Sequence, residues 1–398
     1  MLDTQTIQIV KSTIPLLEGA GTAVTDHFYQ RMFTANPELK DIFNLSNQKS
    51  GRQQFALFSA VAAYAKYIDN LGELGELVER IAQKHTSFDI QPEQYQIVGH
   101  HLIETLRELA PDDFTDDVAE AWIKAYQLLA TVLIDREKTL YQHSREEQGG
   151  WTGPRAFRVK DKIKESELVT SFIFEPVDGQ PIRQYQPGQY IAVRVKPDDA
   201  EHIEIRQYSL SDKYHPDHYR ISVKRESSPI KGMVSNHLHD AVEVGDTVEL
   251  MPPAGAFFLT KTSRSVMLIS GGVGLTPMMS MLETLVSDED YQHDIFFLHT
   301  CKNAQQHSFK PRLAELKQTH SNLHDFYWYS EEANVSEDIH TGLMDINLLR
   351  DKVDFDNVDV YLCGPLEFMR FVRLQLHVNG VPSEHIHFET FGPHDDII

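Results

Sequence analysis

The segment SVMLISGGVGLTPMMSML, residues 265–282, decides the fold of the C-terminal third of this chain. An apolar run of strand length is followed by glycines and then by an apolar helical stretch, which is typical of a strand–turn–helix unit. Pro277 falls where the first turn of a helix tolerates proline. The glycines at 271, 272 and 274 allow close backbone approach, for example to a phosphate. Their spacing is not the G-x-G-x-x-G dinucleotide fingerprint, and a lone glycine turn is more often only a turn.

The same alternation continues to the end of the chain. Apolar strands are predicted in DIFFLHT (294–300), HDFYWYS (324–330) and VDVYLCG (358–364), with helical stretches between them. This pattern predicts a parallel sheet with covering helices over residues 263–398. A second strand–turn–helix unit has Cys363, Gly364 and Pro365 at its turn, and open α/β sheets bind ligands at the carboxyl ends of their strands.

Residues 151–262 have a different pattern of apolar and turn residues. Short alternating segments are separated by turn residues, namely LVTSFIFEPV (168–177), QYIAVRVKP (189–197), YRISVKRE (219–226) and DTVELMPP (246–253). Such a pattern predicts an antiparallel barrel or sandwich.

Two motifs in this segment suggest a site for a flat, phosphate-bearing cofactor. RQYSL (206–210) ends a predicted strand, with Arg206 and Tyr208 on one face and Ser209 on the other. An arginine can grip a phosphate, and an aromatic ring can pack on a flat cofactor. In KGMVSNHLH, Gly232 and Ser235 are expected to form a glycine approach and a serine cap at a helix N-terminus, which suits a pyrophosphate. Taken alone, a strand with a surface arginine is the simpler interpretation.

Residues 1–147 are predicted to be helical, because apolar positions recur at helical spacing. Pro37 and Pro92 are expected in first helical turns. The segment SREEQGGWTGPRAF (144–157) has the glycine and proline content of a hinge.

His85 ends one apolar helical pattern, directly after Lys84, and the aromatic segment 27–43 supplies apolar partners. An apolar box whose polar points are Tyr29, Gln53 and His85 suits an iron porphyrin, with His85 on the iron and the other two near a diatomic ligand. A surface or capping histidine is the simpler interpretation, since the chain contains 20 histidines.

Glu137 shares a helix face with Leu133 and Tyr141, four residues to either side, so it can point inward despite its charge. From the local sequence alone, a solvated Glu137 beside Arg136 and a Tyr95 packed in the core are the simpler interpretations.

Length and charge narrow the class of protein. With 398 residues the chain is expected to form two or three domains. A formal net charge of −22 disfavours nucleic acid and anionic membranes as partners. Two cysteines fit a reducing cytosol, the charged N-terminus is unlike a signal peptide, and no run approaches the roughly 18 apolar residues of a membrane span. We therefore expect a cytoplasmic protein.

The motifs of the last two segments resemble the ferredoxin-reductase superfamily, in which R-x-Y-S and G-x-V-S segments hold FAD. The whole chain resembles the bacterial flavohaemoglobins, on the segments PELKDIFN, QKHTSF, EQYQIVG, IEIRQYSL, YLCGP and FGPH. The resemblance implies a globin haem domain (1–147), an FAD-binding β-barrel domain (151–262) and an NAD(P)H-binding α/β domain (263–398), in one chain that is expected to be a monomer.

The resemblance also implies roles for individual residues. His85 is the proximal ligand of haem b, Tyr29 is the distal residue that stabilises oxygen, and Tyr95 and Glu137 form a hydrogen-bonded relay with His85. Gln53, Phe43, Leu57 and Lys84 complete the expected haem surroundings. The expected FAD residues are Tyr190, Arg206 on the pyrophosphate, Gln207, Tyr208 beside the isoalloxazine, Ser209 at its reactive edge, Gly232 and Ser235. The expected nicotinamide residues are Gly272, Val273, Gly274, Leu275, Thr276, Pro277, Cys363, Gly364 and Pro365, and the tail residues near the flavin are Glu389, Thr390, Phe391, Gly392 and Pro393.

The activity implied is that of an NAD(P)H-dependent nitric oxide dioxygenase, which converts O2 and NO to nitrate and serves NO detoxification. The alternatives are a haem–flavin reductase or peroxide-reducing enzyme, and a globin-type sensor of O2 or NO. Two segments depart from the family pattern: Gly271 stands where alanine is common, and RESSPIKGMVS (225–235) is a long connection, which bears on the role of Ser235.

The cofactor NADH is expected to be preferred over NADPH. Glu331 and Glu332 follow the strand expected to read the adenosine ribose, where a 2′-phosphate would require cations. The alternative is a solvated turn that points away from the nucleotide.

Overall fold

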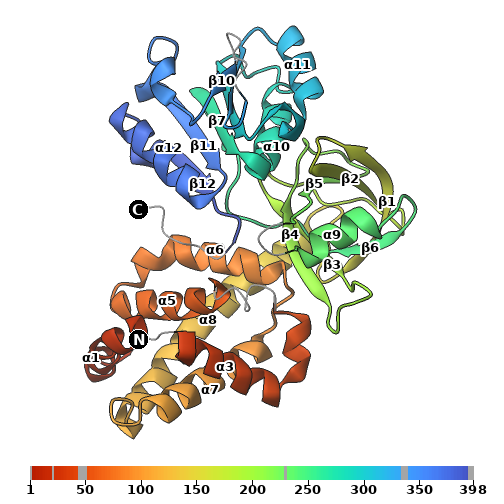
Figure 1. Ribbon diagram of the computed structural model, residues 1–398. Helices are drawn as coiled ribbons and strands as arrows, with labels where there is room; N and C mark the ends of the chain where they lie inside the picture. The colour runs from red at the N-terminus through yellow and green to blue at the C-terminus, as the bar shows by residue number, and fades with distance from the viewer. Residues whose placement is uncertain (1, 20–21, 44–51, 228–230, 333–338, 393–398) are drawn as a thin grey trace. The chain divides into compact units, whose positions relative to one another are not determined.

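The computed structural model describes residues 2–19, 22–43, 52–227, 231–332 and 339–392, and the side chains of residues 22 and 52–56 lie outside the description. The chain folds into two compact units (Figure 1). The first contains Met1–Pro154 with Arg194–Arg206, and the second contains Arg155–Val193 with Gln207–Ile398.

The described part of the first 146 residues consists of helices joined by short turns. They are α1 (Thr4–Ser12), α2 (Ile14–Glu18), α3 (Thr22–Ala35), η1 (Pro37–Asp41), α5 (Arg52–Lys66), η2 (Leu71–Leu74), α6 (Gly75–Thr86), α7 (Pro92–Leu109) and α8 (Asp116–Glu146). Both prolines expected in first helical turns are found there, Pro37 in η1 and Pro92 in α7. The predicted all-helical segment is confirmed.

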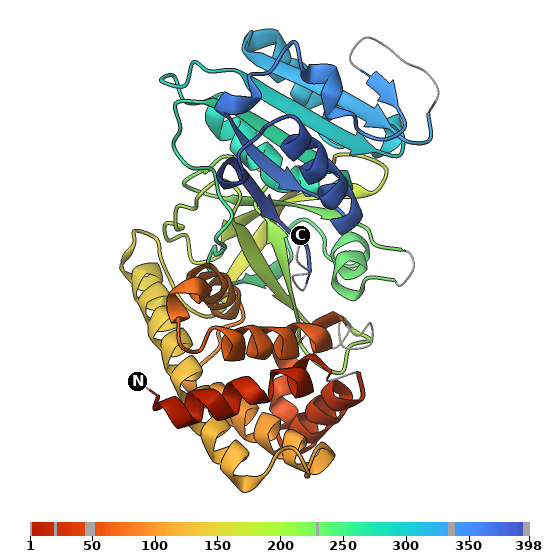
Figure 2. The same ribbon diagram turned by 90° about the vertical axis from the view of Figure 1, so that its left-hand side faces the viewer.

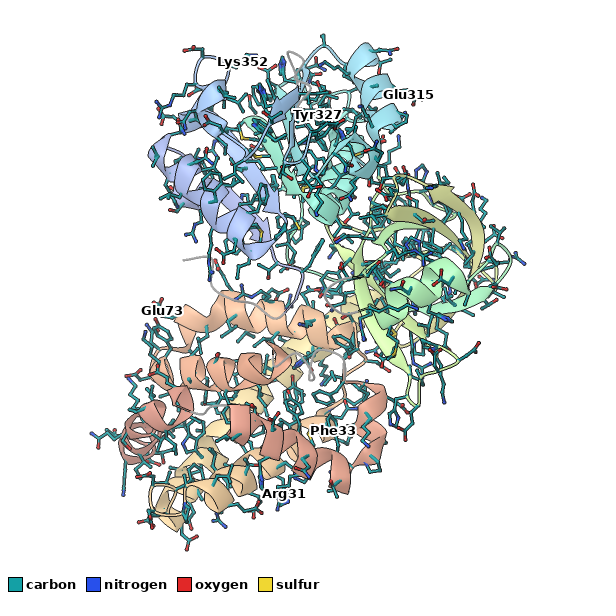
Figure 3. All side chains as sticks on the ribbon, viewed as in Figure 1. Arg31, Phe33, Glu73, Glu315, Tyr327 and Lys352 are labelled. Carbon is teal, nitrogen blue, oxygen red and sulfur yellow. The ribbon has the colours of Figure 1, made fainter. Side chains whose placement is uncertain are left out.

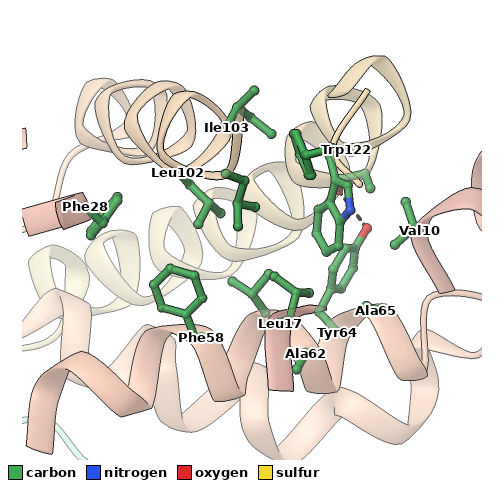
Figure 4. Packing of buried hydrophobic residues seen from close by; sticks show 14 of the residues in the cluster. Val10, Leu17, Phe28, Phe58, Ala62, Tyr64, Ala65, Leu102, Ile103 and Trp122 are labelled. Carbon is green, nitrogen blue, oxygen red and sulfur yellow. Dashed lines mark hydrogen bonds between the residues drawn. The ribbon is translucent and has the colours of Figure 1, made fainter. Parts of the chain in front are cut away.

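The helical core is closed by side chains from helices far apart in the sequence (Figure 4). Trp122 of α8 is 1% exposed and donates its indole N–H to the Thr13 hydroxyl at 2.9 Å. Tyr64 of α5 donates to the Ala125 carbonyl oxygen at 2.7 Å. The long α8 runs along the helical bundle and contacts α1, α6 and α7 (Figure 2).

The next segment forms a six-stranded sheet in the order β4-β3-β6-β1-β2-β5, and the pairs β1–β2, β1–β6 and β2–β5 are antiparallel. Its strands are β1 (Arg155–Lys164), β2 (Val169–Pro176), β3 (Tyr190–Val195), β4 (Glu204–Ser209), β5 (Tyr219–Lys224) and β6 (Thr247–Leu250), and α9 (Met233–Asp240) follows β5. The predicted antiparallel fold is confirmed. No strand was predicted over β1, where charged residues outnumber the alternating apolar residues Phe157, Val159 and Ile163.

The C-terminal segment forms a second sheet, in the order β10-β9-β8-β7-β11-β12, whose pairs are all parallel. The strands are β7 (Ser265–Gly271), β8 (Ile295–Cys301), β9 (Leu323–Tyr329), β10 (Ile339–Thr341), β11 (Val358–Cys363) and β12 (Ile386–Glu389). The helices are α10 (Leu275–Leu285), α11 (Lys310–Thr319) and α12 (Leu366–Val378), with the 3-10 turns η3 (Gly272–Gly274), η4 (Ala304–Gln306), η5 (Ile346–Leu349), η6 (Phe355–Asn357) and η7 (Ser383–His385). The predicted parallel α/β fold is confirmed, with β10 and β12 as strands that the pattern did not indicate.

The two glycine turns of this sheet lie against each other, because β7 and β11 are neighbours with Ser270 opposite Cys363. A Cβ atom on Gly274 would lie 2.3 Å from the Cys363 carbonyl oxygen. A Cβ atom on Gly364 would lie 3.0 Å from the Gly271 nitrogen. Backbone packing between the turns therefore requires these two glycines, before any ligand is considered.

Among the helices of the described residues, none has the combination of length and apolarity needed to cross a bilayer.

Candidate functional site

His85 lies in the last turn of α6 and is joined to two further helices through one ring nitrogen. Its Nδ1 atom is 2.8 Å from the Tyr95 hydroxyl on α7 and 2.8 Å from Glu137 Oε1 on α8. The Tyr95 hydroxyl also donates to Glu137 Oε1. The structure thus contains the hydrogen bonds expected between these three residues.

These contacts determine the tautomer of the His85 imidazole. The Glu137 carboxylate accepts, so the proton of the neutral ring lies on Nδ1 and the lone pair lies on Nε2. No hydrogen bond of Nε2 occurs with any of the described residues. A neutral imidazole with a free Nε2 lone pair and a carboxylate on Nδ1 is the donor arrangement that metal-binding histidines use. The residues therefore fit a haem iron on Nε2.

Glu137 is 3% exposed, which excludes the alternative of a solvated carboxylate. Its neighbour Arg136 pairs instead with Glu79, at 2.9 Å between Nη2 and Oε1. Burial, and then the charge of Glu137, raise the pKa of the Tyr95 phenol well above its usual value, so this hydroxyl stays protonated and donates.

Tyr29 of α3 lies among aromatic side chains and is 5% exposed. Its ring centroid is 5.0 Å from that of Phe28, 5.7 Å from Phe33 and 6.0 Å from Phe43, and Figure 3 labels Phe33 among the side chains of the helical unit. Burial raises the pKa of the Tyr29 phenol well above its usual value. The hydroxyl makes no hydrogen bond with a described side chain, so it is a protonated donor held in an apolar cluster.

The other expected haem neighbours are placed less completely. Phe43 and Leu57 are half-buried and pack against the helical core. Lys84 is half-buried in the turn that carries His85. The side chain of Gln53 lies outside the described residues.

Arg206 on β4 is held by its own strand. Its Nη2 atom is 2.7 Å from Glu204 Oε2, and its Nη1 donates to the Ile205 carbonyl oxygen at 2.8 Å. Ser209 is 7% exposed, whereas Gln207 and Tyr208 are half-buried. Within this end of β4, Ser209 is therefore more buried than Gln207 and Tyr208.

The predicted serine cap is wrong. Gly232 is the N-cap of α9, and Ser235 lies inside the helix, 9% exposed. Its hydroxyl is 3.4 Å from the Glu226 nitrogen, from which it accepts. A Cβ atom on Gly232 would lie 2.4 Å from the Ser235 oxygen, so glycine at 232 leaves room for this hydroxyl. Ser235 therefore binds the backbone of Glu226.

Tyr190 begins β3 and lies over a glycine that the sequence analysis did not single out. Gly255 has a φ of +121°, and a Cβ atom there would lie 3.0 Å from the Tyr190 ring. The only local signal was the glycine within PPAGAFF, which by itself indicates no more than a turn.

The glycine turn after β7 has one open position. Gly272 has a φ of +55°, and a Cβ atom there would have no neighbour within 4 Å. Val273 is half-buried, Leu275, Thr276 and Pro277 are buried, and the Thr276 hydroxyl donates to the Val273 carbonyl oxygen at 3.1 Å. Only Gly272 thus offers an exposed backbone to a ligand at this turn.

The neighbouring turn, Cys363-Gly364-Pro365, carries a fully buried thiol. Burial raises the pKa of Cys363 well above its usual value, so this side chain is a packing group and not a thiolate. Glu389 ends β12 opposite Cys363, and its Oε1 accepts from the Thr390 nitrogen at 3.1 Å. Phe391 is 48% exposed and Gly392 has a φ of +142°. Pro393 lies outside the described residues.

Comparison with known proteins identifies the kinds of domain that the chain contains. Three family models match the chain in order: "Globin" over residues 26–133, "Oxidoreductase FAD-binding domain" over 156–259 and "Oxidoreductase NAD-binding domain" over 268–374. The chain is 52% identical to a flavohemoprotein of Vibrio cholerae, over 99% of both chains.

Solved structures show the same similarity. A flavohemoglobin from Malassezia yamatoensis, determined with bound FAD and haem, is 26% identical with a TM-score of 0.87 and covers 98% of this chain and 100% of its own. The FAD/NAD-binding domain of a nitric oxide dioxygenase from Vibrio cholerae is 42% identical with a TM-score of 0.56, over 60% of this chain and 99% of its own. The chain therefore belongs to the flavohaemoproteins, which join a globin domain to FAD-binding and NAD-binding domains.

Proposed function

We propose that this flavohaemoprotein is an NAD(P)H-dependent nitric oxide dioxygenase that converts NO and O2 to nitrate and thereby removes NO. The single observation that carries the proposal is the hydrogen-bonded set His85, Tyr95 and Glu137. Haem and FAD, when bound, would supply the redox chemistry that carries electrons from the nicotinamide to O2 and NO.

His85 is the proposed proximal ligand, through Nε2. Glu137 accepts the Nδ1 proton and increases the basicity of the ring, which favours electron donation to the iron. Tyr95 donates a second hydrogen bond to the same carboxylate oxygen and so keeps the buried charge of Glu137 satisfied. A globin that only stores oxygen has less need of such an electron-rich ligand than one that carries out chemistry.

Tyr29 is the proposed donor on the opposite, ligand-binding side. Its protonated hydroxyl lies in an apolar aromatic cluster, where a hydrogen bond to a polar ligand is stronger than in water. Gln53 is proposed as its neighbour.

For FAD, Arg206 is proposed to bind the pyrophosphate, Tyr208 to flank the isoalloxazine, and Ser209 to reach its reactive edge, with Tyr190, Gln207 and the Gly232 N-terminus of α9 around them. Ser235 is proposed to act by holding the loop before α9 and not as a helix cap. The support for Arg206 is its orientation by Glu204, which is 4% exposed.

For the nicotinamide dinucleotide, the turns 272–277 and 363–365 are proposed as the binding edge, with Glu389 to Gly392 near the flavin. NADH is proposed as the preferred form. Glu331 and Glu332 do not lie in an unattached turn: Glu331 Oε1 is 3.0 Å from Lys302 Nζ, and Glu332 Oε2 accepts from the Ala304 nitrogen at 2.8 Å. The two carboxylates thus link the ends of β8 and β9, at the edge of the sheet where a ribose is expected.

We further propose a cytosolic monomer without a nucleic-acid partner, since the net charge of −22 repels polyanions. A pure gas sensor would use the globin domain alone, whereas FAD- and NAD-binding models cover residues 156–259 and 268–374.

The proposed function is tested by the amount of nitrate formed for each NO consumed. The purified protein should show haem and flavin absorption, NADH should reduce both, and each NO consumed under aerobic conditions should yield about one nitrate. NADH oxidation with peroxide consumption and without nitrate would instead identify the reductase or peroxide-reducing alternative.

A further inference from the structure

Two fully buried histidines of the NAD-binding domain have no part in the proposed reaction. His299 lies in β8 and is 0% exposed, and His307 lies in the connection between β8 and α11 and is 2% exposed. Their ring centroids are 5.0 Å apart at an interplanar angle of 39°. They form a pair of contacting imidazoles in the interior of the parallel α/β fold.

Each ring has one hydrogen-bond partner. His299 Nδ1 is 2.9 Å from the Ser270 hydroxyl of β7, and His307 Nδ1 is 2.8 Å from the Tyr329 hydroxyl of β9. Neither Nε2 atom has a hydrogen-bond partner among the described residues. Hydroxyl groups satisfy a neutral imidazole but do not neutralise an imidazolium, so the pair is built to be uncharged.

The charged and titratable groups around the pair do not favour a proton on it. On β9, the Tyr327 ring is 4.4 Å from that of His307, and its hydroxyl is committed to Asp325 at 2.6 Å. Asp325 in turn pairs with Lys317 of α11. On α10, the carboxylate of Glu283 is held by Arg312 at 2.6 and 2.8 Å.

One carboxylate contacts the connection itself: Glu332, which follows β9, accepts from the Ala304 nitrogen at 2.8 Å, and its charge contributes to the raised pKa of Tyr329, the partner of His307. The other neighbours do not favour a proton on the pair. Lys310 of α11 is a cation, and burial raises the pKa of the Cys301 thiol of β8 to about 12, so it is uncharged. Burial lowers the pKa of His299 to about 3. Burial, and then His299 and Lys310, lower the pKa of His307 well below its usual value.

The connection that contains His307, residues 302–309, also joins the NAD-binding domain to the FAD-binding sheet. The Gln305 carbonyl oxygen accepts from the Glu167 nitrogen at 2.9 Å, and the Ser308 hydroxyl donates to that of Ser166 at 3.0 Å. The Arg220 guanidinium carbon lies over the Phe309 ring, 4.8 Å from the centroid of that ring.

The backbone of this connection is strained at its end. Phe309 has a φ of +60°, in the left-handed region that is unfavourable for a bulky side chain. Burial of its ring, which is 1% exposed, retains that conformation. The connection is therefore a segment that gains backbone freedom once its buried contacts are lost.

We propose that His299 and His307 form an acid-sensitive latch, in which protonation of the pair releases the connection 302–309 from the sheet and interrupts reduction of FAD by NADH. Reversal of the pH change restores the closed form. The kinetic readout of this latch rests on the proposed NADH oxidation, whereas the structural readout below does not.

The direction in which pH shifts the balance between the open and closed forms follows from proton linkage. The open form has histidines with an ordinary pKa of about 6.5, and the closed form has lower values, so the closed form is fully favoured above about pH 6.5. As pH falls below that value, the open form takes up protons. The ratio of open to closed molecules then rises by about tenfold per pH unit for each histidine, and about a hundredfold if both are protonated.

The first experiment is hydrogen exchange with mass spectrometry on the full-length holoprotein between pH 7.5 and 5.0, corrected for the intrinsic pH dependence of exchange. Protection of residues 302–309 should fall with a slope of one to two protons, while α8 of the globin domain stays protected, and protection should return at pH 7.5. Unchanged protection of the connection, or loss in step with α8, would overturn the latch. This measurement requires no turnover, so its outcome is separate from that of the proposed function.

The second experiment uses His299→Gln, His307→Gln and the double variant, with His324→Gln as the matched control. His324 also lies in the sheet, but its side chain is 41% exposed and pairs with Asp294 at 2.9 Å. NADH-driven reduction of an artificial electron acceptor should lose its acid dependence by about one proton in each single variant and wholly in the double variant, with the control like the parent. Equal pH profiles in all proteins would refute the proposal, and if the variants fail to fold, hydrogen exchange of the parent protein decides.

Discussion

At the scale of single residues, the globin site depends on how a buried carboxylate is satisfied. Glu137 accepts from both the His85 ring and the Tyr95 hydroxyl, and those donors come from residues 52 and 42 positions away in the sequence. A buried carboxylate without such donors would be costly. The three side chains therefore form one unit, and a change at any of them alters the other two.

Replacement of His85 by Ala should abolish haem retention and leave flavin bound, because only the proposed iron ligand is removed. Absorption spectra of the purified variant should lack the haem Soret band and keep the flavin bands. His100→Ala, at an exposed position of α7, is the matched control and should bind haem normally. A normal five-coordinate haem spectrum in His85→Ala would disprove the assignment.

Replacement of Glu137 by Gln should act on the proximal side only. The amide is a weaker acceptor than the carboxylate, so the His85 ring becomes less electron-donating. Resonance Raman spectroscopy of the ferrous protein should show the iron–histidine stretch at lower frequency, with little change in the O2 dissociation rate. An unshifted band would mean that Glu137 does not tune the ligand.

Tyr29→Phe should release O2 faster without loss of haem. It removes one hydroxyl from an otherwise apolar cluster, and a hydrogen bond to a charged acceptor contributes roughly 1.5–3 kcal/mol. The O2 dissociation rate, measured by stopped-flow displacement, should rise by roughly tenfold to a hundredfold. Phe33→Leu, which alters the same cluster without a hydroxyl, is the comparison, and equal rates in Tyr29→Phe and the parent would show that Tyr29 does not face the ligand.

At the scale of elements, two glycines of the turn after β7 are needed for different structural reasons. Gly274 is required by contact with the Cys363 carbonyl, whereas Gly272 has open space and a positive φ. We expect Gly274→Ala to destabilise the NAD-binding domain by roughly 1–3 kcal/mol through overpacking. Gly272→Ala should cost only about 1–2 kcal/mol of backbone strain.

Urea unfolding and NADH titration separate these two variants. Gly274→Ala should lower the unfolding midpoint, and Gly272→Ala should chiefly weaken NADH binding, because its backbone is the exposed part of the turn. Normal NADH affinity in Gly272→Ala would exclude this turn from the nucleotide site.

The ends of β8 and β9 determine the expected cofactor preference. Lys302 and Glu331 form an exposed pair, with side chains 61% and 54% exposed, and such pairs contribute little to stability. Glu331→Arg should therefore leave folding intact and improve kcat/KM for NADPH relative to NADH by about tenfold, which corresponds to 1.4 kcal/mol. Glu315→Arg, on the exposed part of α11, is the control (Figure 3). An unchanged cofactor ratio, or an NADPH preference of the parent, would contradict the expectation.

At the scale of the whole molecule, the succession of three domains is more specific than any single motif. A glycine turn, an R-x-Y-S strand or a histidine at a helix end each has a common structural explanation. Taken together in their order along the chain, these motifs resemble a globin, an FAD-binding domain and an NAD-binding domain. The three family models match in that order. Hydride supply, flavin and haem in one chain are the parts that the proposed reaction requires.

The amino-acid sequence by itself indicated the helical, antiparallel β and parallel α/β segments of the chain, because helical and strand periodicities are local properties. It also located His85 at a helix end. It did not indicate β1, whose residues are largely charged, although Phe157 and Val159 alternate with charged neighbours and are buried.

Only the tertiary structure decided which polar groups are buried and what satisfies them. Glu137 and Arg136 are adjacent in the sequence, yet one is buried against His85 and the other pairs with Glu79. Ser235 resembled a helix cap but lies inside α9, and the role of Gly274 follows from a strand almost ninety residues away. Burial and long-range contact depend on how distant segments pack together, and local sequence carries no direct record of that packing.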